Sequence, residues 1–284
     1  MLHIIKQKLY EIRHSYTSER APKLSVIIPV YNALEDVQKL FNSIDEALLT
    51  TDVEFIIVND ASGKETTDFL IEYAKDKEKF FLYHNENNLG FIKTCNKGID
   101  LASGDIIVLL NSDTMIPPHW DTRIIECFKR NKKIGIASPL STHSAHWNIP
   151  CKDKKEFINM DKIVENTSDK SYPTLICPEG FCFCIRKKVI TQLGKLDEIF
   201  GLGYCEETDF ALRALNKGWK TVLIDNLLVH HKLHASFGSN KKQQLLEHNQ
   251  QILCERWKNL YIKNIRKYPV SSLSEKIYKK IYAQ

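Results

Sequence analysis

Long apolar runs are absent from this sequence of 284 residues. The longest, such as residues 53–58 and 106–110, are far shorter than the roughly 20 apolar residues that span a bilayer. The first residues scatter Lys6, Lys8 and Glu11 among apolar side chains, which excludes the usual core of a signal peptide. We therefore expect a cytoplasmic protein, with peripheral docking on the cytoplasmic membrane face as an open alternative.

Two phosphate-binding loops are also missing. No Gly-x-Gly-x-x-Gly segment follows the first apolar run, which argues against a dinucleotide-binding enzyme. No Gly-x-x-x-x-Gly-Lys-Ser/Thr segment occurs, which argues against a P-loop kinase or ATPase. The eight cysteines include no Cys-x-x-Cys pair, so we expect reduced thiols rather than a zinc site or a disulfide framework.

The composition is that of a folded globular protein, with 43% hydrophobic and 26% charged residues. The formal net charge of +5 is concentrated in a lysine- and arginine-rich segment after Asn240. Such a segment favours an anionic partner, either lipid headgroups or nucleic acid, or it is simply a solvated helical face. Aromatic and basic residues do not interleave as in nucleic-acid binders, so we expect no nucleic-acid partner.

Short β-branched runs alternate with segments of helical spacing, which predicts an α/β fold with a mainly parallel sheet. The predicted strands are residues 24–30, 53–58, 80–83, 106–110, 134–137, 174–186 and 219–224. Helices are predicted between them, including residues 90–102, 187–193 and 206–217, and amphipathic helices follow near the C-terminus. We divide the chain into an N-terminal helical extension (1–23), a main domain (24–238) and a helical basic tail (239–284).

Three finer expectations accompany this outline. Asn32 and Glu35 resemble a capping box for the first helix of the main domain, and Ser272 with Glu275 resembles one for the last helix. Residues 138–173 are polar, contain three prolines and show no sustained period, so we expect a long functional loop. The last helix, apolar on one side and rich in lysine on the other, could lie on an anionic membrane, and the same pattern serves equally for packing against a partner or the domain itself.

Polar residues follow three of the predicted strands, at the edge where open parallel sheets bind ligands. They lie in the segments Pro29-Val-Tyr31-Asn32, Asn59-Asp60-Ala-Ser62 and Asn111-Ser112-Asp113. A tyrosine there could stack on a base, one carboxylate could accept from its ring N–H, and another could hold a metal. Ordinary polar turns would explain each segment equally well.

Two clusters in the second half offer further chemistry. Glu206, Glu207 and Asp209 begin a predicted helix, where acids either favour the helix dipole or deprotonate an acceptor hydroxyl. Helix geometry predicts that Glu206 and Asp209 share a face and that Glu207 points separately. A histidine group, His230-His231-Lys-Leu-His234, follows a strand and could supply a metal ligand.

Taken together, these segments resemble family 2 glycosyltransferases with the Rossmann-like GT-A fold, in the branch common among bacterial polysaccharide enzymes. The resemblance covers roughly residues 24–238 and lies in LSVIIPVYNA, FIIVNDAS, NLGFIKTCNKGI, GDIIVLLNSD, the glycine of PEGFCFCIRKKVI, LDEIFGLGYCEETDFALRALNKGW and HHKLHASFG. It implies a sugar transfer from a nucleoside-diphosphate sugar, such as a UDP- or dTDP-sugar, to a hydroxyl of a glycan or lipid-linked acceptor.

The resemblance also implies roles for individual residues. Glu207 would be the catalytic base, and Asp113 with His231 would hold Mn²⁺ or Mg²⁺, since Asn111 replaces the first aspartate of the family's Asp-x-Asp motif. The acceptor side would include Gly180, Glu206 and Asp209. The nucleotide sugar would be bound by Pro29, Tyr31, Asn32, Asp60, Gly90, Lys93, Asn96, Asn111, Ser112 and Asp113.

Two other functions remain open on the same fold. A sugar-phosphate nucleotidyltransferase would need a glycine-rich, basic loop after the first strand, which PVYNALED does not supply. A non-catalytic scaffold that binds nucleotide sugars would have no use for Asp113, Glu207 and His231 together. We therefore expect an inverting enzyme, in which a single displacement reverses the anomeric configuration.

Overall fold

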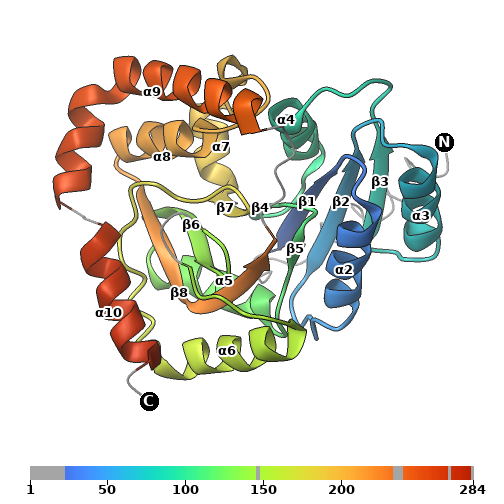
Figure 1. Cartoon of the computed structure of the whole chain (residues 1–284), viewed down its shortest axis with the longest axis horizontal. Helices are drawn as coiled ribbons and strands as arrows, with labels where there is room; N and C mark the ends of the chain where they lie inside the picture. The colour runs from blue at the N-terminus through green and yellow to red at the C-terminus, as the bar shows by residue number, and fades with distance from the viewer. Residues whose placement is uncertain (1–22, 145–147, 233–238, 268–269, 283–284) are drawn as a thin grey trace, which may run out of the picture.

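The structure is a computed structural model and describes residues 23–144, 148–232, 239–267 and 270–282. The predicted helical extension at residues 1–23 therefore lies outside the described residues, apart from Lys23. Within the described ranges the strands form an eight-stranded sheet in the order β3-β2-β1-β4-β7-β6-β8-β5 (Figure 1). Their bounds are β1 Leu24–Val30, β2 Val53–Asn59, β3 Phe80–His84, β4 Ile106–Leu110, β5 Thr114–Met115, β6 Ile134–Ser141, β7 Cys182–Arg186 and β8 Lys220–His231.

Most of the strand pairs are parallel, which confirms the predicted fold class. Strand β1 is parallel to β2 and β4, β2 is parallel to β3, and β6 is parallel to β8. The antiparallel strand β7 joins the two halves by pairing with β4 and β6. Because the parallel strands β1, β2 and β4 end at one edge, the loops that follow them lie side by side.

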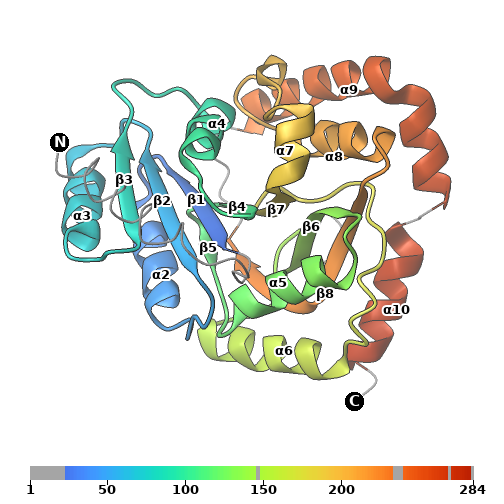
Figure 2. The same ribbon diagram turned by 180° about the vertical axis from the view of Figure 1, so that it is seen from behind.

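Helices cover both faces of the sheet (Figures 1 and 2). Helices α2 and α5 pack on one face, and α4, α7, α8 and α9 pack on the other. The alternation of β1 explains this, since Val26 and Ile28 face the first set and Ile27 faces the second. The bounds are α2 Leu34–Asp45, α3 Lys64–Ala74, α4 Phe91–Leu101, α5 Trp120–Arg130, α6 Lys154–Thr167, α7 Lys187–Leu193, α8 Glu206–Asn216, α9 Ser239–Lys267 and α10 Val270–Tyr282, with a 3₁₀ turn η1 at Glu198–Phe200.

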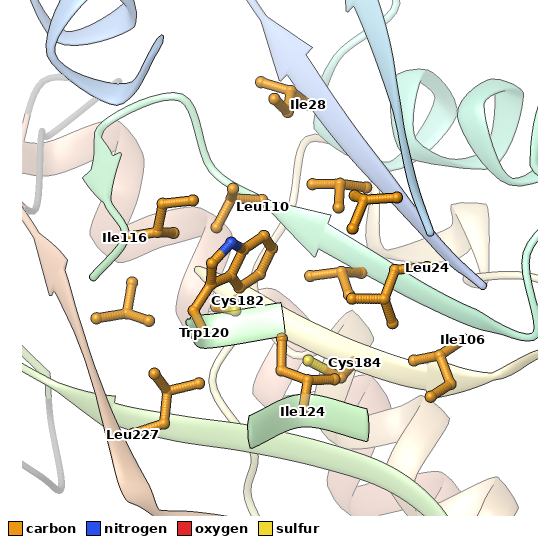
Figure 3. Close-up of a cluster of buried hydrophobic side chains, with 14 of the residues drawn as sticks. Leu24, Ile28, Ile106, Leu110, Ile116, Trp120, Ile124, Cys182, Cys184 and Leu227 are labelled. Carbon is orange, nitrogen blue, oxygen red and sulfur yellow. The ribbon is translucent and has the colours of Figure 1, made fainter. Parts of the chain in front are cut away.

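The centre of the first core cluster is Trp120, at the start of α5. Its ring is completely buried and lies among aliphatic side chains of β1 and β4 and the sulfur atoms of β7 (Figure 3). Cys182 and Cys184 of β7 are buried there as small apolar residues. All eight cysteines are free thiols, as the sequence predicted.

The prediction of a loop over residues 138–173 was wrong, because this segment contains helix α6. The Asp153 side chain accepts a hydrogen bond from the Glu156 backbone N–H at 2.8 Å and caps the helix. The buried face consists of Phe157, Asp161 and Val164, at helical spacing. Since only two of these three residues are apolar, the pattern gave little signal of a helix.

Other boundaries also differ from the prediction. Of residues 174–186 only Cys182–Arg186 is a strand, and Thr174 forms an isolated bridge with Val222. Strand β8 continues to His231, well beyond the predicted end. The capping box proposed for the first helix is not formed, because α2 begins after Ala33 without a side-chain cap. Helix α10 begins at Val270, before the predicted start at Ser272.

The apolar residues of α10 do not face outward as expected for a membrane-binding helix. Ile277 and Ile281 are buried against α6 and neighbouring strands, in a cluster with Phe157 and Val164. The domain itself therefore covers the apolar face that we had assigned to a membrane. None of the described helices has the length and apolar character needed to cross a bilayer.

Candidate functional site

Asp60 fixes the loop after β2 to the start of α4. Its carboxylate is buried and accepts hydrogen bonds from Asn85 Nδ2 (2.7 Å), the Leu89 backbone N–H (2.8 Å) and the Gly90 backbone N–H (2.9 Å). Gly90 has a φ of +82°, and a Cβ there would lie 2.8 Å from Leu202 Cδ2. A glycine is thus required where the chain turns beneath this carboxylate.

The loop after β1 is held by Asn32. Its Oδ1 accepts a hydrogen bond from the Gly63 backbone N–H at 2.8 Å, and its own backbone N–H donates to Ser62 Oγ at 2.9 Å. Asn32 has a φ of 57°, in the left-handed region that asparagine tolerates. Pro29 is buried within β1, whereas Tyr31 is 53% exposed at the edge of the sheet.

The short strand β5 brings Asp113 beside His231. Thr114 pairs with His231 in the antiparallel register, and Asp113 Oδ1 lies 3.5 Å from His231 Nε2. The other ring nitrogen, Nδ1, lies 3.3 Å from the His143 carbonyl oxygen. A carbonyl can only accept, so Nδ1 is the donor in this contact, and Nε2 is the ring nitrogen that faces the Asp113 carboxylate.

These side chains fit a divalent cation that is shared with a bound ligand. Neighbouring ligands about 2.1 Å from Mg²⁺ in an octahedral shell lie about 3 Å apart, close to the observed separation of Asp113 and His231. Within the described part of the chain the buried Asn111 Oδ1 has no hydrogen-bond partner. Among the described residues no group of three or more His, Cys, Asp or Glu side chains is placed to hold an ion, so Asp113 and His231 alone would leave positions open for other ligands.

Glu206 and Glu207 form a carboxyl pair at the N-terminus of α8. Burial raises the pKa of both groups. The Glu207 charge and the hydrogen bond to Glu207 raise the pKa of Glu206 further, whereas the hydrogen bond from Glu206 lowers the pKa of Glu207. Both groups are therefore easier to protonate than a free carboxyl, and the pKa of Glu206 is raised further than that of Glu207. The expectation that Glu207 points separately was wrong, because both long side chains turn toward each other.

Gly180 and Phe181 connect this carboxyl pair to the Asp113–His231 pair. A Cβ on Gly180 would lie 3.9 Å from Glu207 Cδ, so this glycine borders the Glu207 carboxyl group. The Phe181 ring stacks on the His231 ring, with centroids 5.0 Å apart. The Phe181 backbone carbonyl oxygen also accepts a hydrogen bond from the Asn111 backbone N–H at 2.9 Å. The three sequence segments thus meet around one short piece of backbone.

Residues 25–194 match the family model described as glycosyl transferase family 2, which covers more than half of the chain. The chain belongs to this family. A dolichol-phosphate mannosyltransferase from Pyrococcus furiosus is 33% identical over 116 residues, 41% of this chain and 33% of that protein. A poly-beta-1,6-N-acetyl-D-glucosamine synthase from Staphylococcus epidermidis is 33% identical over 115 residues, 40% of this chain and 27% of that protein. The matched segment thus spans a third or less of these curated relatives.

Solved structures support the GT-A fold of this family 2 chain. The mannosyltransferase PcManGT from Pyrobaculum calidifontis, in complex with GDP-Man and Mn²⁺, superposes with a TM-score of 0.56 at 17% identity, over 83% of this chain and 67% of that one. TarS from S. aureus, in complex with UDP-GlcNAc, gives a TM-score of 0.57 at 16% identity, over 82% of this chain and 71% of that one. At such identities the likeness concerns the fold alone.

Two residues that we assigned to the glycosyltransferase site, Asp209 and Asn96, are buried and form hydrogen bonds within the protein. The buried Asp209 carboxylate accepts from Arg213 Nε (2.8 Å), Arg256 NH1 (2.9 Å) and Trp257 Nε1 (2.7 Å), so it holds α9 against α8 rather than facing an acceptor. The buried Asn96 exchanges hydrogen bonds with the backbone of Leu196, at 3.0 and 3.1 Å, and does not face a donor.

The remaining assigned residues lie near the edge of the sheet. Lys93 is exposed on the first turn of α4, and Ser112 is partly exposed in the turn before β5. Sequence reasoning missed Asn85 and His143, whose contacts support Asp60 and His231. It also missed Asn249 of α9. None of these three positions stands in a motif, so only the structure identifies them.

Proposed function

We propose that this chain is an inverting, metal-dependent glycosyltransferase. It would move a sugar from a nucleoside-diphosphate sugar, a UDP- or dTDP-sugar, to a hydroxyl of a glycan or lipid-linked acceptor. The observation that carries the proposal is the Gly180-Phe181 segment, which borders Glu207 on one side and stacks on His231 on the other. This contact supports a role for Glu207 as the base beside a cation held by Asp113 and His231, at the ligand-binding edge of the sheet.

The donor end would be formed by Tyr31 and Asp60. The exposed Tyr31 ring offers a face on which a nucleobase can stack, and the Asp60 carboxylate offers an acceptor for a ring N–H. Asp113 and His231 would hold Mn²⁺ or Mg²⁺, which when bound offsets the charge that develops on the departing diphosphate. Gly90 is the N-cap of α4 and Lys93 lies on its first turn, so both would contribute to the donor end.

The transfer itself would use Glu207. Its carboxylate takes the proton of the acceptor hydroxyl as the hydroxyl oxygen bonds to the anomeric carbon and the bond to the diphosphate breaks. In this proposal Glu206, whose pKa is raised further, donates a hydrogen bond to Glu207, which favours the negative charge on the base. Because attack and departure occur on opposite faces of the sugar, one displacement inverts the anomeric configuration.

We further propose a role in bacterial surface polysaccharide or glycoconjugate synthesis at the cytoplasmic membrane face. The support is the resemblance to a poly-beta-1,6-N-acetyl-D-glucosamine synthase and the exposed Lys276 and Lys279 on α10. Exposed lysines attract anionic headgroups without insertion of an apolar face. A lipid-linked acceptor would then be reached from the membrane surface.

One experiment separates this function from the two alternatives. Purified protein is incubated with Mn²⁺, a panel of UDP- and dTDP-sugars and simple glycan or lipid-linked acceptors, and both the release of nucleoside diphosphate and the transfer of the sugar to the acceptor are measured. A nucleotidyltransferase would instead release pyrophosphate from a nucleoside triphosphate and a sugar phosphate. A scaffold protein would show a thermal shift with nucleotide sugars but no turnover. Either result would overturn the proposal.

A further inference from the structure

The loop at residues 200–205, between η1 and α8, has an unusual backbone. Gly201, Gly203, Tyr204 and Cys205 all have positive φ, at 64°, 132°, 70° and 73°. Such conformations are costly for Tyr204 and Cys205, which carry side chains, and they persist only where surrounding contacts fix them. The backbone bonds inside the loop are modest, for example Gly203 N–H to the Phe200 carbonyl at 3.4 Å.

The contact that fixes this loop comes from Asn249 on α9. Its Nδ2 amide donates to the carbonyl oxygens of Phe200 (2.9 Å), Gly203 (2.8 Å) and Tyr204 (3.0 Å). Asn249 is 0% exposed, and its Oδ1 has no hydrogen-bond partner among the residues that the structure describes. A buried amide whose donor end serves three carbonyls while its acceptor end is unpaired is specialised for holding those carbonyls.

The same loop contacts both ends of the site. It leads directly into Glu206 and Glu207, so its conformation sets where α8 begins and where the two carboxyl groups lie. Leu202, at its tip, approaches Gly90, which is bound to Asp60. A shift of this loop would therefore move the base relative to the donor side, and displacements of about 1 Å at a reacting group can cost about 100-fold in rate.

We propose that Asn249 is a positioning residue for glycosyl transfer, acting through the loop at 200–205 on the Glu206–Glu207 pair. Asn249 lies on α9, outside residues 25–194, the part matched by the family model. In this proposal α9 positions the loop at 200–205 in addition to packing on the family domain. This inference rests on the proposed function for its catalytic part, whereas its structural part is independent of activity.

The test compares Asn249→Ala and Asn249→Ser with the control Asp121→Asn. Asp121 is also completely buried and holds a loop, accepting from Thr50 N–H (3.0 Å), Thr51 N–H (2.9 Å) and Thr51 Oγ1 (2.7 Å). That loop precedes β2, at the opposite edge of the sheet from the site. Asparagine can still accept these hydrogen bonds but carries no charge, so the control reports what weakening a comparable buried tether does to stability away from the site.

We expect Asn249→Ala to lower kcat about 10- to 100-fold, with the KM for the donor within about twofold of wild type. Asn249→Ser keeps one donor and should recover part of the loss. Asp121→Asn should lower the unfolding temperature without a comparable fall in kcat. The inference is overturned if both Asn249 variants keep kcat within twofold of Asp121→Asn, or if donor binding weakens as much as kcat falls.

Amide hydrogen exchange tests the structural part without any assay of transfer. Exchange across residues 200–206 should rise in Asn249→Ala and stay unchanged in Asp121→Asn. If the wild-type protein transfers no sugar, the proposed function fails, and raised exchange would still support the tether. Unchanged exchange in Asn249→Ala would overturn the inference even in a fully active enzyme.

Discussion

Asp113 Oδ1 lies 3.5 Å from His231 Nε2, although the two residues come from segments far apart in the chain. The backbone explains the approach, since Thr114 pairs with His231 and the Lys232 N–H donates to the Asp113 carbonyl oxygen. Strand pairing thus fixes the two proposed metal ligands, Asp113 and His231, close together. They would need no rearrangement of side chains to bind a cation. The first prediction concerns this pair.

Removal of the metal should abolish transfer. EDTA should stop turnover in the wild type, and added Mn²⁺ or Mg²⁺ should restore it. Asp113→Ala should lose activity that neither ion restores, and its unfolding temperature should stay close to that of the wild type because the side chain is at the surface of the site. His230→Gln is the control, since His230 bonds Thr142 instead. Full turnover by metal-stripped protein would contradict the assignment.

The base should be Glu207 rather than either neighbouring carboxylate. Glu207→Gln keeps the shape but cannot accept a proton, so kcat should fall about 10²- to 10⁴-fold while nucleotide affinity changes little. Asp209→Asn should chiefly lower stability, because Asp209 is bonded to Arg213, Arg256 and Trp257. Steady-state kinetics and nucleotide titrations check both variants. A Glu207→Gln enzyme within a few-fold of wild type would exclude this role.

The proton on Glu206 predicts a shift in pH dependence. The base must be ionised, so the rate falls as pH drops through the pKa of Glu207, which burial raises and the hydrogen bond from Glu206 lowers. Glu206→Ala removes that donor, so the acid limb of the kcat profile should move to higher pH. Glu206→Gln keeps an N–H donor and should leave the limb near its original position. Identical limbs in the two variants would argue against a shared proton.

Glu206 should also make stability depend on pH. Its folded pKa lies well above the usual value, so the stability associated with the protonated group is fully present below the unfolded pKa and is lost as pH rises. Glu206→Gln cannot ionise and should therefore unfold at higher denaturant than wild type at neutral pH. The gain should vanish in acid, as urea melts at a series of pH values would show. A gain that is the same at all pH values would contradict this.

The sequence predicted the strands that set the fold, but not the contacts that complete the site. Residues 24–30 and 106–110 were correct because a strand buried on both faces is a continuous apolar run. The pairing of β5 with β8 was not predictable, since two residues carry no period. The role of Asp209 depends on Arg256, 47 residues away, and no local pattern reveals such a partner.

Residue type was a better guide than geometry at the candidate site. Asp60 and Asp113 were singled out as carboxylates at strand ends, whereas the family resemblance selected Glu207 among three neighbouring acids. Asn249 was missed because a single asparagine on a long helix usually faces solvent. Its meaning follows only from the strained loop beneath it, whose backbone conformation is not encoded by any spacing of residues.

The last prediction concerns the attachment of α10. Ile277 and Ile281 are 8% and 6% exposed, whereas Tyr282 on the same helix is 57% exposed. Ile277→Ala and Ile281→Ala should each destabilise the protein by about 2 kcal/mol, at the low end for buried isoleucine because these sites are at the rim of their cluster. Tyr282→Ala is the control and should cost less than about 0.5 kcal/mol. Chemical denaturation measures the stability of all three variants.

Liposome flotation with anionic vesicles compares the same variants with Lys276→Glu/Lys279→Glu. If α10 packs on the domain, only the lysine variant should reduce vesicle binding. Isoleucine variants that keep full stability but lose vesicle binding would instead show that this face inserts into the membrane.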